Sequence, residues 1–517
     1  MKIFNQKSRT QNMMRIAVVS EISTIINLLF GFIYRSIFLS ILSAEYLGIN
    51  GLFTQILQLL SLADLGIAGA ITFRFYKPIQ QEDVFQVGKL MNFFKTIYRI
   101  ILVVIVGIGL LLLPFLHLLI KDTSEIPSDV NLYVIYLLFL IQSASSYMFA
   151  YRQTLLTADQ KQYIVSLMQL GGTFLRYLGQ VIFLICTHNY SLTIAINIGL
   201  NILSNYAISL YAKRKYAPVF EIKETLSFLE KKEIFNDTKA TLCHKIGGVV
   251  LNSTDSIILS KFAGLLSVGL YSNYSLIIGN LSTLAKQILS NTTASLGNAC
   301  AELNAQERYK VYRNLVFLNL WIASTLTICL YVLINPFIEL WVGKSMLLNK
   351  LTVISLCAQF FFELARQVNL SYTSASGLFV KDIYRPFIEA GINLVVSIVL
   401  VNILGIAGVF LGTVISCVTT VTWREPYLIF KYDLKRKANE YIANFIIFIC
   451  FTLLLCVIFE VIFTRFITNF FMWVICGLAI MILTQCIFVA FMHKRPEFTY
   501  MVQIIKRIFR KALKRQR

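Results

Sequence analysis

The stretch IILVVIVGIGLLLLPFLHLLI, residues 100–120, decides the fold class of this chain. It contains no Asp, Glu, Lys or Arg, and it matches the roughly 20 apolar residues that a helix needs to cross a hydrocarbon core of about 30 Å. Similar runs recur from Ile16 to Met492 with short polar breaks between them. Of the 517 residues, 57% are hydrophobic and 14% are charged, whereas soluble domains contain roughly 45–50% apolar and about 25% charged residues. The pattern predicts an all-α polytopic membrane protein.

About fourteen transmembrane helices are predicted along the chain. The longest polar connection, 213–239, separates two sets of six spans, and apolar residues alternating with Lys and Glu within it predict an amphipathic helix. We therefore expect an N-terminal six-helix lobe at 1–212, a cytoplasmic linker at 213–239, a C-terminal six-helix lobe at 240–430, two additional spans in 431–492 and a basic amphipathic tail at 493–517. The predicted spans are 16–42, 47–73, 93–119, 131–154, 162–186, 191–212, 240–263, 268–297, 311–334, 348–374, 384–403, 405–430, 441–463 and 469–492.

The distribution of Lys and Arg predicts which side of the membrane each connection faces. The net charge is +21, and most of the 47 Lys and Arg residues lie in the N-terminus, in alternate connections and in the C-terminal tail. Cytoplasmic connections are rich in Lys and Arg, so both termini are predicted to be cytoplasmic, in a bacterial inner membrane. Nucleic acid is not an expected partner, because no nucleic-acid-binding signature lies between the spans. The opposite connections are short and hold only Lys121, Lys261, Lys344, Lys350 and Arg465.

The two halves of the chain resemble each other in sequence. Leu47-Gly48-Ile49 and Val268-Gly269-Leu270 are 221 positions apart, and Pro114-Phe115 and Pro336-Phe337 are 222 positions apart. Each half has an even number of predicted spans, so both halves insert with the same orientation. Parallel repeats of this kind are a transporter architecture in which the substrate binds at the interface of the repeats.

Ionisable residues inside the predicted spans are the candidate site residues, because a charge at the centre of a span costs at least about 2.5–3.5 kcal/mol on insertion scales. We expect the cationic members to line a central cavity and to bind phosphate through charge-assisted hydrogen bonds. The acidic members are expected to act in ion coupling or gating. The alternative is that each charge is neutralised within its own lobe or reaches the interface from a helix end. The cationic candidates are Arg35, Lys245, Lys286, Arg74 and Arg366, and the acidic candidates are Glu21, Asp64 and Asp255.

The sequence contains no motif for hydrolysis or for cofactor binding. It lacks a phosphate-binding G-x-x-x-x-G-K-[ST] loop, an H-E-x-x-H pair and a G-x-S-x-G turn, and its ten cysteines form no C-x-x-C pair. The chain is therefore not expected to be an enzyme or to hold a metal or a cofactor. Energy for transport would come from ion gradients, membrane potential or substrate flux.

Seven short stretches spread over the first twelve predicted spans have a familiar pattern. They are EYLGINGL at 45–52, LSLADLGI at 60–67, NSTD at 252–255, VGLYSNY at 268–274, NPFIELW at 335–341, GIAGVFLGT at 405–413 and WREPY at 423–427. They resemble the Wzx-type polysaccharide and O-antigen flippases, which form the polysaccharide transporter family of the multidrug/oligosaccharidyl-lipid/polysaccharide (MOP) superfamily and are related to MATE exporters and lipid II flippases. The resemblance implies a V-shaped pair of pseudo-symmetric six-helix bundles, without catalytic centre or cofactor. Asp64 stands where this family more often has Glu.

The resemblance also implies a substrate and partners. The chain would translocate undecaprenyl-pyrophosphate-linked oligosaccharide repeat units from the cytoplasmic to the outer leaflet by alternating access, for capsule, exopolysaccharide or O-antigen synthesis. Membrane lipids, a coupling H⁺ or Na⁺ and polysaccharide polymerase machinery would be its other partners, and the chain would be a monomer. One alternative is a MATE-like ion-coupled multidrug exporter, although cationic spans oppose a cationic cargo. The other is a membrane polysaccharide polymerase or ligase, a class with a large external loop that this chain lacks.

Overall fold

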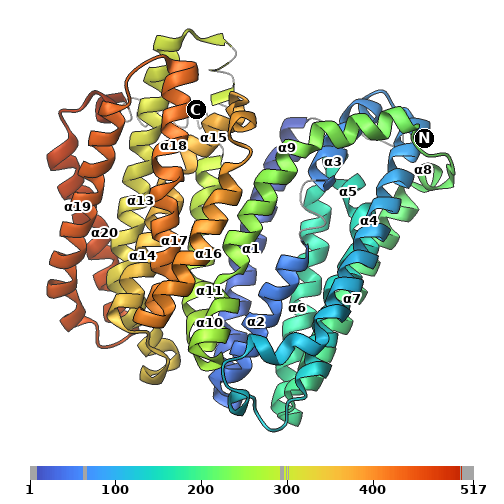
Figure 1. Cartoon of the computed structure of the whole chain (residues 1–517), viewed down its shortest axis with the longest axis horizontal. Coiled ribbons are helices and arrows are strands. Elements are labelled where there is room, and N and C mark those ends of the chain that lie inside the picture. The colour runs from blue at the N-terminus through green and yellow to red at the C-terminus, as the bar shows by residue number, and fades with distance from the viewer. Residues whose placement is uncertain are drawn as a thin grey trace, which may run out of the picture. The chain divides into compact units, whose positions relative to one another are not determined.

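The computed structural model describes residues 9–61, 67–290, 302–500 and the positions 296, 297, 300 and 502. Within these helices, the side-chain description leaves out positions 9–18, 21, 67–71, 73, 236–245, 252, 288 and 290. All regular elements of the described part are helical (Figure 1). The chain divides into two compact units, unit 1 from Met1 to Gly269 and unit 2 from Leu270 to Arg517.

Unit 1 holds the first ten α-helices and the start of α11. Short connections join neighbouring helices, and two 3₁₀ segments, η2 at Leu113–Leu119 and η3 at Thr123–Glu125, follow α4. The α-helices are α1 (Arg9–Ile41), α2 (Ala44–Leu60), α3 (Ile67–Gln80), α4 (Val84–Leu112), α5 (Leu132–Ala158), α6 (Gln162–Thr187), α7 (Tyr190–Lys215), α8 (Ala217–Glu221), α9 (Phe228–Ser253), α10 (Asp255–Ala263) and α11 (Leu265–Ser290).

Unit 2 holds the rest of α11 and the helices that follow it. Two of its predicted spans are broken: the helix that starts at Lys350 is interrupted at Arg366, and the one that starts at Ile406 is interrupted at Thr420. The elements are α13 (Ala305–Val342), η4 (Lys344–Met346), α14 (Lys350–Ala365), α15 (Gln367–Ala375), η5 (Leu378–Asp382), α16 (Arg385–Leu404), α17 (Ile406–Thr419), α18 (Val421–Leu428), the π-helical turn η6 (Ile429–Leu434), α19 (Asn439–Phe463), η7 (Thr464–Phe466) and α20 (Phe470–Met492).

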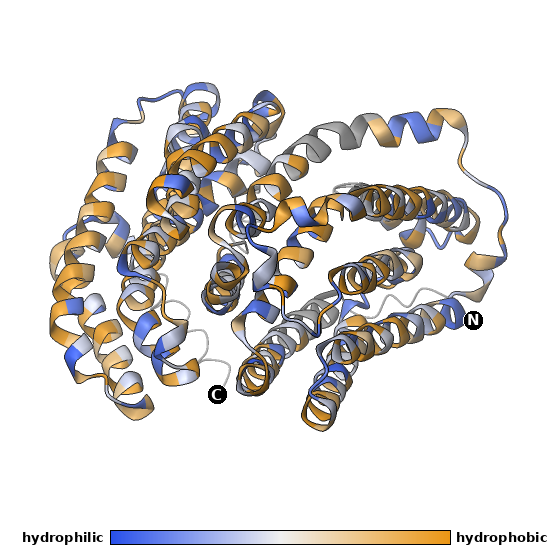
Figure 2. Cartoon of the chain, turned by 60° about the horizontal axis from the view of Figure 1, so that its bottom comes forward, coloured by the Kyte–Doolittle hydropathy of each residue, from blue (hydrophilic) through white to orange (hydrophobic). Residues whose placement is uncertain are grey.

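Eleven helical stretches of the described residues are long and apolar enough to cross a membrane, and hydrophobic residues dominate the helices in Figure 2. They confirm the prediction of a helical multi-pass membrane protein. The predicted spans 47–73, 240–263 and 268–297 are not among them, so the count of fourteen and the two six-helix bundles remain predictions. The stretches are Ile22–Ile41, Val84–Leu119, Leu132–Ala158, Gln162–Thr187, Tyr190–Lys215, Ala305–Val342, Lys350–Ala375, Arg385–Leu404, Ile406–Leu434, Asn439–Phe466 and Phe470–Met492.

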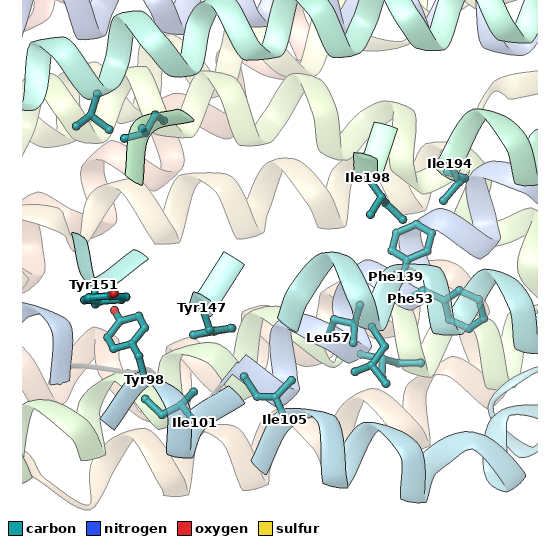
Figure 3. Close-up of a cluster of buried hydrophobic side chains, with 14 of the residues drawn as sticks. Phe53, Leu57, Tyr98, Ile101, Ile105, Phe139, Tyr147, Tyr151, Ile194 and Ile198 are labelled. Carbon is teal, nitrogen blue, oxygen red and sulfur yellow. The ribbon is translucent and has the colours of Figure 1, made fainter. Parts of the chain in front are cut away.

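The core of unit 1 is built from aliphatic and aromatic side chains of α2, α4, α5 and α7. Figure 3 shows Phe53 of α2 beside Phe139 of α5, and their ring centroids are 5.9 Å apart in an edge-to-face arrangement. Tyr98 of α4 packs on Tyr147 of α5 with a centroid separation of 5.9 Å. Edge-to-face pairs add roughly 0.5–1.5 kcal/mol beyond the area they bury. These contacts hold α2 and α4 against α5, which carries polar side chains described below.

Helices α2 and α11 cross at two glycines that are equivalent in the internal repeat. A Cβ atom at Gly48 would lie 2.1 Å from the carbonyl oxygen of Leu265, and a Cβ at Gly269 would lie 2.0 Å from the carbonyl oxygen of Ala44. Each glycine therefore contacts the residue four positions before the other glycine. Small residues at such a crossing allow two backbones to approach closely inside a membrane. Only glycine fits at either position.

The linker between the sixth and seventh predicted spans is bound to α4. The amide of Asn92 donates to the carbonyls of Ile222 and Glu224 at 2.7 and 2.9 Å. At the start of α9, Ser227 and Glu230 form a capping box, and the hydrogen bonds from Ser227 lower the pKa of Glu230. The predicted amphipathic linker helix is therefore divided between the short α8 and the first turns of α9. Most of the predicted basic tail lies outside the described residues.

The last two membrane helices pack on α13 within unit 2. Trp321 of α13 stacks on Phe488 of α20, with ring centroids 4.3 Å apart. The Trp321 indole donates to Oε1 of Gln485 at 2.8 Å, and the Gln485 amide donates to Thr325 at 3.1 Å. Interhelical hydrogen bonds in a membrane contribute about 0.6 kcal/mol on average, so the aromatic contacts supply a large share of this packing.

Candidate functional site

In unit 1, Arg35 lies in the membrane-crossing part of α1 beside two tyrosines. Tyr34 precedes Arg35 in α1, and the rings of Tyr34 and Tyr177 have a centroid separation of 5.5 Å. Tyr177 comes from α6, directly after Arg176. This part of the unit therefore combines positive charge with neutral hydrogen-bonding groups.

A polar ladder runs along α7, where side chains four residues apart form one face. Its rungs are hydrogen bonds from side chains of α5 and α6 to Asn197, Asn201, Asn205 and Ser209 of α7. The donors are Gln180 to Asn197 at 3.3 Å, Arg176 to Asn201 at 3.1 Å, Gln153 to Asn205 at 3.1 Å and Arg152 to Ser209 at 2.9 Å. The ladder thus joins three helices through groups that also suit sugar hydroxyls and phosphate oxygens.

The two arginines of the ladder have only neutral partners among the described residues. Besides the rungs, Arg176 donates to Thr173 at 2.7 Å, and Arg152 lies over the rings of Tyr151 and Phe220. The Nε atoms of both arginines are buried without a hydrogen-bond partner. Guanidinium groups inside a membrane normally pair with carboxylates or backbone carbonyls, or face a water-filled cavity. The ladder therefore supplies uncompensated positive charge in unit 1.

Asp255 occupies the break between α9 and α10. Its side chain is 5% exposed, and its Oδ1 atom is buried without a hydrogen-bond partner in the described part of the chain. The hydroxyls of Ser253, Thr254 and Ser260 nearby in the sequence are also buried without partners. The break is therefore a place where a proton or a small cation would find unused oxygen atoms.

Arg74 lies on the wall of a 510 Å³ cavity in unit 1. Its Nη2 atom is 3.2 Å from Oε1 of Glu233, which belongs to α9. Lys77 and Glu230 line the same cavity. Arg74, one of the cationic candidates predicted from the sequence, thus makes an ion pair across the α3–α9 contact.

In unit 2, the two described cationic candidates form ion pairs. Lys286 of α11 pairs with Glu363 of α14, and both side chains are about one-third exposed. Arg366, at the break between α14 and α15, pairs with Glu425 at 2.7 Å and with Glu389 at 3.5 Å. The charges of Lys286 and Arg366 are therefore matched by carboxylates that the sequence analysis did not select.

Arg366 belongs to a buried ring of alternating charge. Arg385 of α16 reaches Glu389 at 2.7 Å and Glu425 at 3.6 Å, so each glutamate lies between the same two arginines. Asp382 of η5 extends the network to Arg385 at 2.7 Å and to Arg424 at 3.3 Å. Figure 1 places α15 and α18 side by side at one end of unit 2, and their contact brings these groups together. Three arginines thus face three carboxylates.

The structure locates some predicted site residues and leaves others undescribed. Asp64 lies outside the described residues, as do the side chains of Glu21 and Lys245. Arg35, Arg74 and Asp255 lie in unit 1, and Lys286 and Arg366 lie in unit 2, so their assignment to a common cavity remains a prediction. Sequence reasoning missed Arg152, Arg176 and the ladder, although Asn197, Asn201, Asn205 and Ser209 repeat at intervals of four. It also missed Glu363, Glu389 and Arg385, for which no such signal exists.

Comparisons with known proteins show the fold. No protein-family model matches the chain, and no curated protein matches its sequence. The lipid II flippase MurJ, in an inward closed conformation, aligns with a TM-score of 0.66 and 14% identity over 92% of this chain and 100% of that chain. An inward-facing multidrug resistance MATE family transporter of the MOP superfamily aligns with a TM-score of 0.55 and 15% identity over 80% of this chain and 98% of its own.

A third solved structure extends the comparison. A MOP superfamily transporter from Pyrococcus furiosus, described as having a binding pocket of reverse polarity, aligns with a TM-score of 0.51 and 13% identity over 82% of this chain and 96% of its own. The chain therefore has the fold of MOP superfamily transporters and is a multi-pass membrane protein.

Proposed function

We propose that this protein is a Wzx-type flippase of the MOP superfamily. It translocates undecaprenyl-pyrophosphate-linked oligosaccharide repeat units across a bacterial cytoplasmic membrane, with both of its termini in the cytoplasm. Two six-helix lobes, 1–212 and 240–430, would alternate access to the two leaflets. A lipid II flippase is among the proteins that share its fold, which supports a lipid-linked cargo.

The observation that most strongly supports this proposal is the positive charge of the polar ladder in unit 1. Arg152 and Arg176 have only neutral partners in the described part of the chain. A diphosphate would supply the missing negative charge and accept charge-assisted hydrogen bonds from the guanidinium groups. The amides of Asn197, Asn201 and Asn205 on the same helix face offer donors and acceptors to sugar hydroxyls.

The same charge argues against the two alternative functions. An exporter of cationic drugs would place its cargo next to like charge, which opposes binding. A polymerase or ligase would need an acid–base or nucleophilic group held beside a substrate site, and the ladder offers amides, hydroxyls and guanidinium groups. These groups hold and orient a ligand without transferring protons to it.

The residues selected from the sequence receive roles within this proposal. Arg35, Lys245 and Lys286, with Arg74 and Arg366 toward the cytoplasmic side, would contact the substrate in the course of transport. Lys286, Arg74 and Arg366 would first have to leave their present carboxylate partners. Glu21, Asp64 and Asp255 would serve ion coupling or gating, and the unused oxygen of Asp255 supports that role.

Substitution of an arginine of the ladder, or of a cation predicted to line the central cavity, is expected to slow lipid transport. In proteoliposomes with a fluorescent undecaprenyl-pyrophosphate oligosaccharide and a membrane-impermeant quencher, Arg176→Gln, Arg35→Ala and Lys286→Ala should each reduce the rate about tenfold or more. Hydrogen bonds to charged groups contribute roughly 1.5–3 kcal/mol, and about 1.4 kcal/mol corresponds to a factor of ten. Imposed proton and sodium gradients would identify the coupling ion.

Arg465→Gln is the matched control, since it removes one positive charge at an exposed position in η7. It should transport like the wild type. Two results would contradict the proposal. The first is wild-type protein that moves no lipid while the same vesicles extrude a small cationic dye, and the second is unchanged lipid transport in all three variants.

A further inference from the structure

A group of exposed aromatic and basic side chains lies in unit 2, where α16 begins and α18 ends. Trp423 and Tyr427 are one helical turn apart on α18, with ring centroids separated by 6.4 Å, and Trp423 is 54% exposed. Lys431 of η6 donates to the Tyr427 hydroxyl at 2.6 Å. These three residues, Lys381 of η5 and Tyr432 of η6 are all exposed, and together we call them the aromatic–basic surface.

The two lysines of this surface share an aromatic ring. The ammonium group of Lys381 lies 3.8 Å from the centroid of the Tyr432 ring, and that of Lys431 lies 5.5 Å from the same centroid. Lys431 also lies 5.0 Å from the centroid of the Tyr427 ring. A ring face attracts a cation through its quadrupole but carries no net charge. The tyrosines therefore hold the two ammonium groups close together and leave both positive charges unbalanced.

The carboxylates of the neighbouring segments do not balance these lysines. Asp382 is held by two arginines at 2.7 and 3.3 Å, and Asp433 lies 3.1 Å from Arg308. Within the described residues, neither Lys381 nor Lys431 forms an ion pair with a carboxylate. Three further exposed cations follow in the connection to α19, namely Lys435, Arg436 and Lys437. The surface therefore has an excess of positive charge.

The aromatic–basic surface lies where two membrane-crossing stretches meet water. Arg385–Leu404 begins beside it and Ile406–Leu434 ends within it. The first stretch exposes large apolar side chains along one face, among them Ile388, Val395 and Ile403, which is the expected composition of a face that contacts lipid tails. Trp and Tyr are enriched at membrane–water interfaces, and Lys clusters next to a span attract anionic head groups. The Lys and Arg distribution of the sequence predicts that this end is cytoplasmic.

We propose that the aromatic–basic surface binds an anionic phospholipid of the cytoplasmic leaflet. The lipid phosphate interacts with the ammonium groups of Lys381 and Lys431, and the Trp423 ring lies beside the glycerol and the upper part of the acyl chains. The apolar face of α16 continues toward the tails, which favours a lipid over a soluble phosphate. A zwitterionic lipid gains less, because its own cationic group is repelled by the lysines. This inference goes beyond the proposed function and requires neither its cargo nor alternating access.

Trp423 provides a reporter for the lipid next to this surface. The protein is reconstituted in vesicles of phosphatidylcholine with a small share of phosphatidylglycerol, and one of the two lipids carries bromine, which quenches tryptophan fluorescence on contact. The difference between the wild type and W423F isolates this residue from the other tryptophans of the chain, of which there are four in all. Brominated phosphatidylglycerol should quench Trp423 about tenfold more than its share of the lipid predicts, because each Lys near an anionic surface contributes roughly fivefold. Quenching in proportion to that share overturns the proposal.

Substitution of the two lysines should remove this preference. In K381Q/K431Q, brominated phosphatidylglycerol should quench Trp423 only in proportion to its share. The matched control is K213Q/R214Q, which also removes two exposed positive charges from an end predicted to be cytoplasmic, that of α7. It should keep the wild-type preference. An unchanged preference in K381Q/K431Q, or an equal loss in both double variants, overturns the proposal.

Mass spectrometry of the intact protein released from detergent tests the same site without relying on Trp423. The wild type and K213Q/R214Q should retain one more anionic phospholipid than K381Q/K431Q, and equal retention by all three overturns the proposal. Inorganic phosphate should displace the lipid no more than sodium chloride of equal ionic strength does, and stronger displacement would show a site for free phosphate instead.

Competition separates this inference from the proposed function. If the undecaprenyl-pyrophosphate oligosaccharide displaces brominated phosphatidylglycerol from Trp423 at equal amounts, the surface binds the cargo, which overturns this inference and leaves the proposed function intact. If wild-type protein moves no lipid-linked sugar, the proposed function fails while the quenching and retention results still decide whether the surface binds an anionic phospholipid.

Discussion

Gly269→Val is expected to destabilise the protein strongly and to reduce lipid transport to background. The Cβ of valine would lie 2.0 Å from the carbonyl oxygen of Ala44, and the obstacle is backbone, so no side-chain rotation relieves the clash. Overpacking typically costs about 1–3 kcal/mol and occasionally more. Here α2 and α11 would have to separate, which places the cost at or above the top of that range. The measurement is the thermal unfolding temperature of the detergent-solubilised protein, together with the flux assay.

The same helix provides the control for this prediction. Gly279 of α11 has no atom within 4 Å of a built Cβ, so Gly279→Val should fold and unfold close to the wild type. Alanine substitutions at the same two glycines give a second comparison, because Gly→Ala in an open helical position stabilises a helix by roughly 0.8–1 kcal/mol. Gly279→Ala should therefore gain stability and Gly269→Ala should lose it. Equal unfolding temperatures for the two alanine variants would show that the α2–α11 crossing is not a close contact.

The spans that the sequence predicted most accurately are those without internal breaks. Residues 384–403 and 469–492 were predicted, and the structure has Arg385–Leu404 and Phe470–Met492. Hydropathy determines such helices because their backbone must satisfy its own hydrogen bonds in lipid. The break at Thr254 was not predicted, since hydropathy does not register the backbone change at a polar N-cap position. The extension of α13 from Ala305 to Val342 beyond the predicted 311–334 begins with a capping box at Asn304 and Glu307, which the sequence analysis did not use.

The candidate site could be predicted only as a set of residue types. Lys286 and Arg366 were selected because they are cations in apolar surroundings, but their partners Glu363 and Glu425 lie 77 and 59 positions away. No local periodicity indicates contacts at that distance in sequence. The polar face of α7 could have been predicted from the sequence, because its polar residues recur every four positions, about one helical turn. Its pairing with Arg152 and Arg176 depends on how α5 and α6 pack, which one sequence does not reveal.

Arg385→Gln is expected to be the most destabilising substitution in unit 2. The guanidinium group is 9% exposed and donates to Asp382 and Glu389, at 2.7 Å each. Its removal leaves three carboxylates facing the two remaining arginines, and breaking a buried ion pair from one side typically costs about 3–5 kcal/mol. In a protein of marginal stability, such a loss would lower the unfolding temperature by many degrees and reduce the yield of folded protein.

A second substitution separates charge balance from packing. The double variant Arg385→Gln/Glu389→Gln restores equal numbers of positive and negative groups, so it should regain part of the lost stability. Contacting residues typically show coupling energies of about 0.5–3 kcal/mol in such cycles. Lys344→Gln provides the baseline, because its pair with Glu339 is exposed and exposed pairs contribute little. If the double variant were less stable than Arg385→Gln alone by the full cost of Glu389→Gln, the two side chains would be uncoupled. The alternating ring would then not be an electrostatic unit.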